Sequence, residues 1–392
     1  MTRGRRGNGE GTIVQRKNGT YEAKISIEGG KRKSIYGKTR REVQDKLKTA
    51  LYEQQQGTLI TAPQQKLSEF LREWLEKTQK YDVGPRTYER YEEVVRLHII
   101  PALGHYYLQK LKPLHIKNFY AKKLEDGLKA RTVQNFHNVL HKALDTAVRW
   151  NLVARNMCDQ VDPPRAEDYE AQPLELEQLK KLMVAAQGHP IEALFLLTLA
   201  TGLRRGEILG LKWQDINMNV GTLQVRRVLA RVPTILKTVE RKGYMEKNTK
   251  TKKSRRSIII APFALEALKQ HRERQNLVKE KAGRFWQDKD LVFCTSMGTP
   301  LNPDRDVRIP FKKLLQKAGL PNVRFHDLRH SAATLLLSMG VHPKIVQEIL
   351  GHSNISITLN IYSHVLPTMQ QDAIAKLNAA FMDTAGGEHK PL

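Results

Sequence analysis

Two polar stretches that contain proline divide the sequence into three parts. Residues 54–65 carry Pro63 and show no apolar periodicity, whereas residues 163–173 begin and end with proline and are acidic in the middle. Stretches of this kind link domains, because they offer no continuous apolar face to bury. A chain of 392 residues is also too long for a single core of ordinary size. We therefore expect separately packed domains.

These linkers set the expected bounds. The prediction is an N-terminal domain at 1–57, a linker at 58–66, a helical domain at 67–160, a linker at 161–173, a C-terminal domain at 174–383 and a tail at 384–392. The expected fold class is multidomain α+β. It combines a small three-stranded sheet with one helix, an all-α bundle, and a mainly α domain with a small antiparallel sheet.

The N-terminal part alternates as a sheet does. Asn18-Gly19 is a two-residue hairpin turn, and residues 21–27 after it alternate between apolar and polar side chains. Thr39 and Glu42 then form a capping box that opens a helix. Three strands followed by one helix are predicted.

The middle part reads as helices. Apolar residues between Leu67 and Leu75 recur at helical spacing, and three later segments repeat this pattern between prolines and glycines. Four helices without a strand predict a bundle, with the second helix ending at Pro101.

The C-terminal part contains both helical and strand patterns. Its most apolar stretch, 191–200, ends at Thr201-Gly202, so that Arg204 begins the next helix. Strands are predicted at 222–226 and 256–260, with a lysine-rich hairpin arm before the second. Helices are predicted from there to the end.

The charge balance indicates the class of partner. A net charge of +26 and a pI near 10.0 favour a polyanion, with nucleic acid first and an anionic membrane surface second. No apolar run approaches the roughly 20 residues that span a bilayer, which argues against the membrane. The two cysteines, Cys158 and Cys294, have no metal-ligand spacing, which fits a reducing cytoplasm and argues against zinc or disulfides.

Basic residues in all three parts could grip phosphates. Each could equally belong to a charged, solvated face, and for any single residue that is the ordinary explanation. The candidate DNA contacts are Arg16, Lys17, Lys24, Lys31, Arg32, Lys33, Arg86, Lys122, Lys129, Arg131, Lys252 and Lys253.

Three motifs concentrate reactive side chains. They are Thr-Gly-Leu-Arg-Arg-Gly-Glu at 201–207, Arg-Phe-His-Asp-Leu-Arg-His at 324–330, and Leu-Gly-His-Ser at 350–353 followed by Tyr362. Arginines, histidines and a tyrosine suit a phosphodiester, whose cleavage needs cations at the non-bridging oxygens, a nucleophile and an acid for the leaving oxygen.

In this order the three motifs resemble the signature boxes of the tyrosine recombinases, in particular the integrases of phages and conjugative transposons. The resemblance runs from about residue 10 to about residue 380. It implies an arm-type DNA-binding domain, a core-binding bundle and a catalytic domain. The implied activity is site-specific recombination through a 3′-phosphotyrosine intermediate, which integrates and excises a mobile element without metal or ATP.

The candidate roles divide the chemistry among few residues. Arg204 and Arg329 would hold the scissile phosphate, because a guanidinium meets two phosphate oxygens at once. Tyr362 would be the nucleophile. For Arg204 the alternative is a buried salt bridge with Glu207 or Asp215, and for Tyr362 it is a buried ring with one hydrogen bond.

The remaining roles belong to histidines and a lysine. His326 is the candidate acid and base beside the nucleophile, and His352 the candidate donor to the phosphate. The resemblance of residues 250–256 to the family's Lys-Thr-Lys-Ser-Ser-Arg-Arg arm implies Lys250 as the acid for the leaving oxygen, with Lys252 as runner-up. A zinc site from His326, His330 and His352 matches no ordinary ligand spacing, so no metal and no cofactor are expected.

The resemblance also implies partners. They are double-stranded DNA at arm-type and core-type sites of the element ends, three further copies in a tetramer on DNA, and an excisionase or a DNA-bending accessory protein. The expected location is the bacterial cytoplasm, at the nucleoid, without a membrane. An apolar stripe between Met369 and Phe381 either packs within the chain or docks on a neighbouring copy.

Two rival functions remain. One is a relaxing topoisomerase of the type IB class, which shares this catalytic logic. The other is a site-specific DNA-binding protein with an inactive centre, in which Tyr362→Phe would change nothing.

Overall fold

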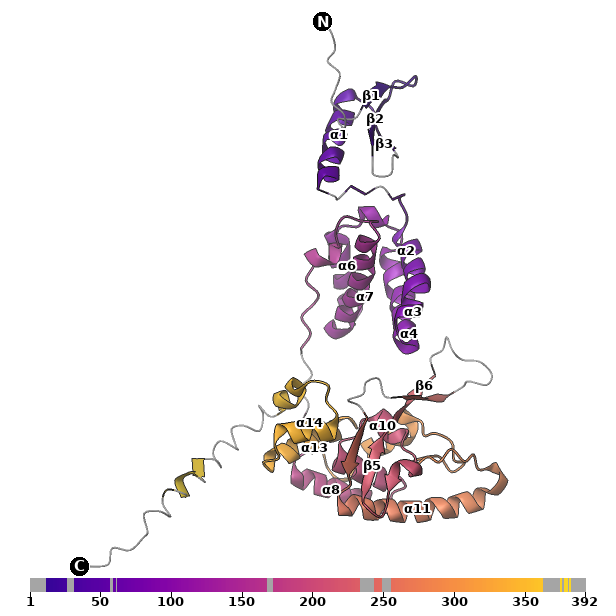
Figure 1. Ribbon diagram of the computed structural model, residues 1–392, viewed down its shortest axis with the longest axis vertical. Helices are drawn as coiled ribbons and strands as arrows, with labels where there is room; N and C mark the ends of the chain where they lie inside the picture. Colours follow the sequence, from indigo (N-terminus) through magenta and orange to yellow (C-terminus); the bar gives the residue numbers. More distant parts are fainter. Residues whose placement is uncertain are drawn as a thin grey trace, which may run out of the picture. The chain divides into compact units, whose positions relative to one another are not determined.

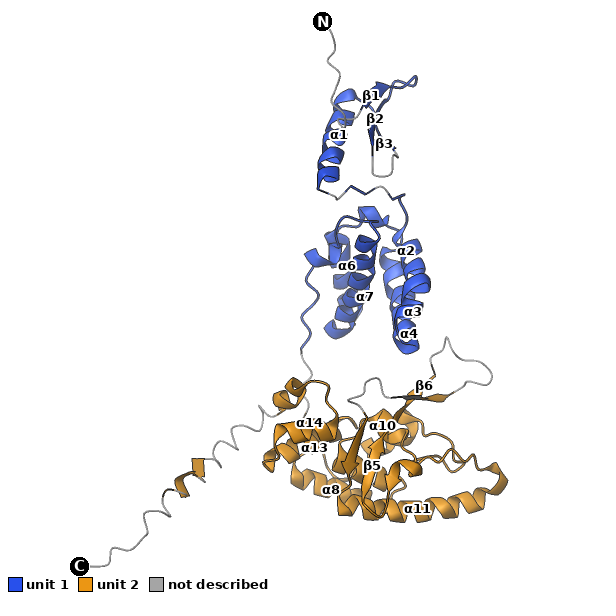
Figure 2. Cartoon of the chain, viewed as in Figure 1, with its two compact units in different colours: residues 1–168, 233–235 blue, residues 169–232, 236–392 orange. Residues whose placement is uncertain are grey.

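The computed structural model describes residues 12–26, 32–56, 59–60, 62–167, 172–232, 243–248, 255–361, 374–375, 377–379 and 381. Contacts divide this part of the chain into two compact units, one holding the described residues up to 167 and the other those from 172 on (Figure 2). The first unit contains two separate hydrophobic cores, one under a sheet and one among helices. The division into three domains therefore stays a prediction. No helix within these ranges is long and apolar enough to cross a membrane.

The N-terminal part is a three-stranded sheet with a helix on one face (Figure 1). Ala23 and Ile25 of the central strand are fully buried with Val43 and Leu47 of the helix. Thr39 caps that helix as predicted, by accepting from the backbone N–H of Glu42 at 3.2 Å. The other half of the predicted capping box differs, because the Glu42 carboxylate accepts at 2.8 Å from the backbone N–H of Lys38, one residue before the cap. The elements are β1 (Thr12–Gln15), β2 (Tyr21–Ser26), β3 (Arg32–Gly37) and α1 (Arg40–Gln55), paired antiparallel in the order β1-β2-β3.

The second core of the first unit lies in a helical bundle, which confirms the helical reading of the middle part. Its elements are α2 (Leu67–Trp74), α3 (Lys80–Asp82), α4 (Pro85–Val94), α5 (Ile100–Leu103), α6 (Pro113–Glu125) and α7 (Ala130–Arg149).

One predicted helix end is wrong. The second helix of the bundle continues past Pro101 to Leu103, through a π-helical turn at Val95–Ile99. After that turn the N–H of Ile100 donates to the carbonyl of Val95, five residues back. The π-helical turn shifts the backbone hydrogen-bond pattern. Pro101, which has no N–H to donate, therefore lies at the start of the next α-helical segment, and the helix continues through it.

The second unit surrounds a large core with helices and a small sheet, and a smaller hydrophobic cluster joins α13 and α14. The sheet is antiparallel in the order β4-β5-β8, and a separate two-stranded ribbon, β6-β7, leads into the lysine-rich arm. The elements are α8 (Leu176–Ala186), α9 (Glu192–Thr201), α10 (Arg205–Leu209), β4 (Ile216–Asn217), β5 (Thr222–Val225), β6 (Arg227–Arg231), β7 (Tyr244–Asn248), β8 (Arg256–Ile259), α11 (Pro262–Ala282), α12 (Ile309–Lys317), α13 (Asp327–Ser338) and α14 (Pro343–Leu350).

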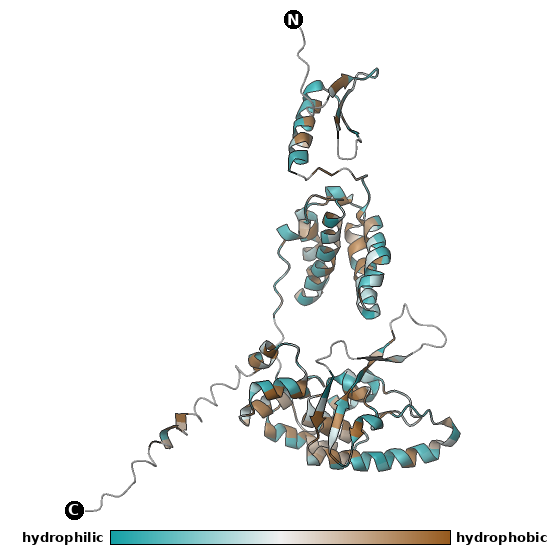
Figure 3. Ribbon diagram, in the orientation of Figure 1, coloured by the Kyte–Doolittle hydropathy of each residue, from teal (hydrophilic) through white to brown (hydrophobic). Residues whose placement is uncertain are grey.

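Helix α11 belongs to this core only at its beginning. Its buried residues are Ala264, Ala267 and Leu268, all in the first two turns. The rest of the helix is mostly hydrophilic (Figure 3). The catalytic candidates that the structure describes, Arg204, His326, Arg329 and His352, lie on other elements, at the start of α10, at the start of α13 and just after α14.

Glycines let α10 lie directly on the ribbon. A Cβ on Gly210 would lie 2.8 Å from the backbone nitrogen of Leu229 in β6, and one on Gly206 would lie 3.2 Å from the carbonyl oxygen of Leu229. Because Arg204 precedes α10, this contact ties the position of the arginine to the ribbon.

We expect Gly210→Ala to destabilise the second unit by about 1–3 kcal/mol, because the added methyl meets backbone that cannot rotate away. Urea unfolding of the full chain measures the change. Gly84→Ala is the control, since no atom lies within 4 Å of its added Cβ and its φ is negative. Equal stability of the two variants would contradict the close contact between α10 and β6.

Candidate active site

The first motif places Arg204 at a helix start beside a tight turn. Helix α9 ends at Thr201 and is followed by Gly202, whose φ of 60° lies in the left-handed region. A Cβ on Gly202 would collide with Cδ2 of the buried Leu350, so this position has no room for a side chain. The first and third motifs therefore pack against each other through a glycine.

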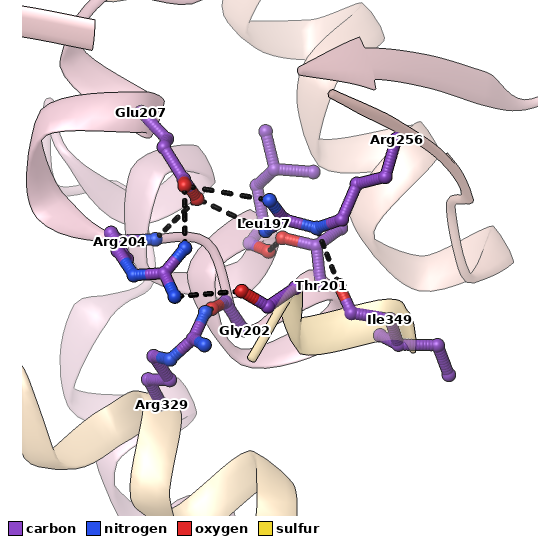
Figure 4. A network of polar contacts seen from close by, with 9 residues as sticks. Leu197, Thr201, Gly202, Arg204, Glu207, Arg256, Arg329 and Ile349 are labelled. Atoms are coloured by element: carbon purple, nitrogen blue, oxygen red, sulfur yellow. Dashed lines mark hydrogen bonds and ion pairs between the residues drawn. The ribbon is translucent and has the colours of Figure 1, made fainter. Parts of the chain in front are cut away.

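Arg204 is held from two sides. Its Nη1 donates to Glu207 Oε1 at 2.8 Å, and its Nη2 donates to the carbonyl of Gly351, also at 2.8 Å (Figure 4). The salt bridge that was considered as an alternative thus forms, with Glu207; Asp215 pairs with Arg227 instead. The Arg204 side chain nevertheless keeps 37% of its surface exposed, which leaves it able to meet a ligand.

Arg329 is buried and only partly paired. It is 3% exposed, and its Nη1 donates to the carbonyl of Gly202. Its Nη2 is buried and has no hydrogen-bond partner among the residues that the structure describes. Burial, and after it the charge of Arg204, lower the pKa of Arg329 to about 9, so the group is still charged at neutral pH. Two neighbouring guanidinium groups with a donor to spare favour an anion between them.

The third motif presents His352 just after a helix end. Helix α14 stops at Leu350, and Gly351 follows in the left-handed conformation with φ of 66°. His352 Nδ1 lies 2.9 Å from the hydroxyl oxygen of the fully buried Thr358. If that hydroxyl donates, the ring proton is on Nε2 and can itself be donated. Burial, then the charges of Arg329 and Arg204, lower the pKa of His352 to about 3.

His326 lies at the start of the helix that carries Arg329. It is the N-cap of α13, one position before the first helical residue. Burial, then His330 and Arg329, lower the pKa of His326 to about 4. The rings of His326 and His330 meet edge to face with centroids 5.3 Å apart. Both candidate histidines are therefore neutral at pH 7, and a neutral imidazole can accept a proton.

These pKa shifts predict that the DNA-free protein loses stability in mild acid. His326 and His352 protonate less readily in the folded protein than in the unfolded chain. The free energy of unfolding is therefore highest above the ordinary histidine pKa of about 6.5 and falls as the pH drops from there towards about 4. Urea unfolding between about pH 7 and about pH 5 measures this slope.

A substitution tests whether His352 causes this dependence of stability on pH. His352→Asn should make it shallower, whereas the same substitution at the exposed His105 is the control. An unchanged slope in His352→Asn would contradict the buried, neutral state of His352.

Several predicted residues lie outside the described part of the chain. These are Lys31, Lys250, Lys252, Lys253 and Tyr362. The described chain after His352 is helical from 355 to 361, directly before Tyr362.

The candidate DNA contacts that are described lie in the first unit. Arg16 and Lys24 flank Glu22 on the sheet at 3.8 and 3.6 Å, and Lys33 donates to the carbonyl of Ile60 at 2.6 Å. Lys122 pairs with Asp126 at 3.2 Å. These contacts fit a solvated face as well as a DNA-binding one, so both readings stay open. The remaining candidate DNA contacts in the first unit are Lys17, Arg32, Arg86, Lys129 and Arg131. Of these, Arg131 donates to Gln134 at 3.0 Å.

Sequence reasoning missed two residues that build the site. Arg256 binds Glu207 and the end of α14, and Thr358 lies against His352. The signal for Arg256 was a charged residue at the first position of a strand with a buried face, where an unpaired charge is costly. Thr358 gave no such signal, because threonine is common in helices and loops alike.

Comparison with known protein families gives two matches. The phage integrase family matches residues 172–369. The phage integrase N-terminal SAM-like domain matches residues 66–124, which run from the residue before α2 to the penultimate residue of α6.

Individual proteins are similar over most of the chain. A "tyrosine recombinase XerC-like" protein of Caldanaerobacter subterraneus subsp. tengcongensis is 35% identical over 378 residues, which are 92% of this chain and 96% of that protein. The Tn1549 transposon integrase in complex with transposon right end DNA has a TM-score of 0.66 at 22% identity, over 79% of this chain and 99% of that one. A lambda integrase tetramer bound to a Holliday junction has a TM-score of 0.55 at 18% identity, over 91% and 96%. The two structures show a shared fold.

Proposed function

Because the chain belongs to the phage integrase family of tyrosine recombinases, enzymes that cut and rejoin DNA, we propose that it integrates and excises a mobile element through Tyr362. The observation that carries the proposal for this chain is the pair Arg204 and Arg329. One guanidinium is partly exposed, and the other has a buried donor without a partner among the described residues. A scissile phosphate between them would satisfy that donor and relieve the repulsion of the two charges.

The proposed reaction conserves the energy of the broken bond. The Tyr362 oxygen attacks the phosphorus, the bond to the 5′ oxygen breaks, and the DNA 3′ end is left as a phosphotyrosine ester. A 5′ hydroxyl of another strand then reverses the step and rejoins the DNA. Since one ester replaces another, no ATP is consumed.

Proton transfers complete each step. His326, neutral at pH 7, accepts the phenol proton, and Lys250 gives a proton to the leaving 5′ oxygen. His352 donates from Nε2 to a non-bridging oxygen while Thr358 holds its Nδ1 side. These roles follow the family pattern at matching positions, and the burial of His326 and His352 supports them.

The rest of the chain would bind the DNA and hold the subunits together on it. We assign arm-type sites to the sheet with Arg16, Lys24 and Arg32, and core-type sites to the bundle together with the second unit. A homotetramer on DNA fits the exposed apolar side chains of Ile374, Leu377 and Phe381, which are 55–70% exposed. The described residues of that stripe thus favour docking on a neighbour, while Met369, Ala373 and Ala380 lie outside the described part. An excisionase or a DNA-bending protein would decide between integration and excision. The reaction would take place in the bacterial cytoplasm.

A recombination assay tests this function. The purified protein is incubated, without metal or ATP, with a circle that joins the two ends of its element and with a target duplex. We expect joint products when the ends are present, and no relaxation of a supercoiled plasmid that lacks them. Relaxation of any plasmid without recombination would favour the topoisomerase.

A further inference from the structure

Arg256 is the third arginine of the network in Figure 4, and it is the most buried after Arg329. Its side chain is 8% exposed at the start of β8. Nη2 donates to Glu207 Oε2 at 3.0 Å, and Nη1 lies 3.4 Å from Glu207 Oε1. Nε donates to the carbonyl of Ile349 at 2.7 Å. One planar guanidinium thus binds a carboxylate and a helix end simultaneously.

At the carboxylate, Arg256 shares Glu207 with Arg204. Glu207 Oε1 accepts from Arg204 Nη1 at 2.8 Å, and Oε2 accepts from the backbone N–H of Arg204 at 3.0 Å. Burial raises the pKa of Glu207, but the hydrogen bonds and charges of Arg256 and Arg204 together outweigh burial and hold the pKa below its ordinary value. Among the described ion pairs of Glu207, removal of Arg256 would leave the one with Arg204, and the buried carboxylate would then compete with the phosphate for that cation.

At the helix end, Arg256 supports the turn that presents His352. The last carbonyls of a helix lack partners within the helix. Here the carbonyl oxygen of Ile349 accepts from Arg256, and that of Gly351, just after the helix, accepts from Arg204. A Cβ on Gly351 would lie 2.8 Å from Arg256 Nη1, so the guanidinium lies directly against this turn. Both arginines therefore fix the chain immediately before His352.

We propose that Arg256 is a positioning residue for recombination: it aims Arg204 through Glu207 and fixes the turn at 349–351 before His352, and it does not bind the scissile phosphate itself. The proposal rests on the proposed function. It differs from a DNA-contact role, because all three of its nitrogens already face protein acceptors.

The test separates cleavage from binding in the full chain. Arg256→Met is mixed in excess with a nicked duplex of an element end, and the rate of covalent adduct formation and the DNA affinity are measured. We expect the rate to fall about 100-fold, because a catalytic group displaced by about 1 Å loses that much, while the affinity changes less than about threefold. A folded Arg256→Met that cleaves at the parent rate would overturn the proposal.

A double-mutant cycle asks whether Arg256 acts through Glu207. In a Glu207→Gln chain, Arg256→Met should lower the rate by clearly less than in the parent chain, about tenfold or less, because part of its effect has already been lost. An equal loss in both backgrounds would overturn the link to Glu207. As a control, the rate of adduct formation and the DNA affinity are measured for Arg255→Met, because Arg255 is the exposed neighbour of Arg256.

Two further outcomes have a defined meaning. If Arg256→Met does not fold, Arg256→Lys carries the test: one ammonium cannot reach both Glu207 and Ile349, so a slower rate with retained binding is expected and a parent rate would overturn the proposal. If the parent chain itself forms no adduct while it binds the DNA, the proposed function fails, and this role of Arg256 fails with it.

Discussion

Tyr362→Phe is expected to abolish covalent attachment to DNA while leaving DNA binding intact. The substitution removes one oxygen, and without it no phosphotyrosine ester can form. We expect the rate of strand cleavage to fall by at least about 10⁴-fold, because the loss of a nucleophile leaves only positioning and electrostatic stabilisation. Gel analysis of denatured mixtures with a nicked element-end duplex measures the adduct, and fluorescence anisotropy measures the affinity.

The stability of the variant is the control for this result. An unfolding midpoint equal to that of the parent chain shows that the missing oxygen, and not misfolding, stops the reaction. Recombination by Tyr362→Phe at the parent rate would contradict the assignment and would favour another nucleophile.

Arg329→Met is expected to lower cleavage by about 10³-fold without lowering stability. The guanidinium is 3% exposed and has one nitrogen without a partner among the described residues, so folding without DNA carries an uncompensated cost. Methionine is of similar length and removes that cost, which makes the DNA-free variant at least as stable as the parent. Single-turnover cleavage and urea unfolding measure the two quantities.

Leu328→Ala is the matched control, one residue away in the same helix. Leu328 is 1% exposed in the large core, so its truncation should cost about 2–5 kcal/mol of stability. Its cleavage rate should stay within about tenfold of the parent while the protein is folded. If Arg329→Met instead unfolded the protein as Leu328→Ala does, Arg329 would be a structural ion and not a phosphate ligand.

The local features of the site were predictable because they are written in short stretches of sequence. Gly202 and Gly351 each follow the last residue of a helix, and both adopt the left-handed conformation that ends helices. Thr39 caps α1 for the same local reason. The motif spacing also puts Arg329 three residues after His326, at one end of α13.

The contacts between distant segments were not predictable. The bond from Arg204 to the carbonyl of Gly351 spans 147 residues, and the bond from Arg256 to Ile349 spans 93. Such contacts depend on how helices pack, which the period of one segment does not reveal. Pro101 was misread because a π-helical turn before it changes which N–H groups need a partner, and no residue pattern marks that turn.

Mapping the covalent adduct tests the central claim most directly. The protein is incubated with a nicked element-end duplex and a chelator, the DNA is trimmed, and peptides are identified by mass spectrometry. We predict a single adduct on Tyr362, joined to the 3′ phosphate of the cleaved strand, with a free 5′ hydroxyl on the released piece. An adduct on another residue, attachment to a 5′ end, or tightly bound DNA without any adduct would contradict the account.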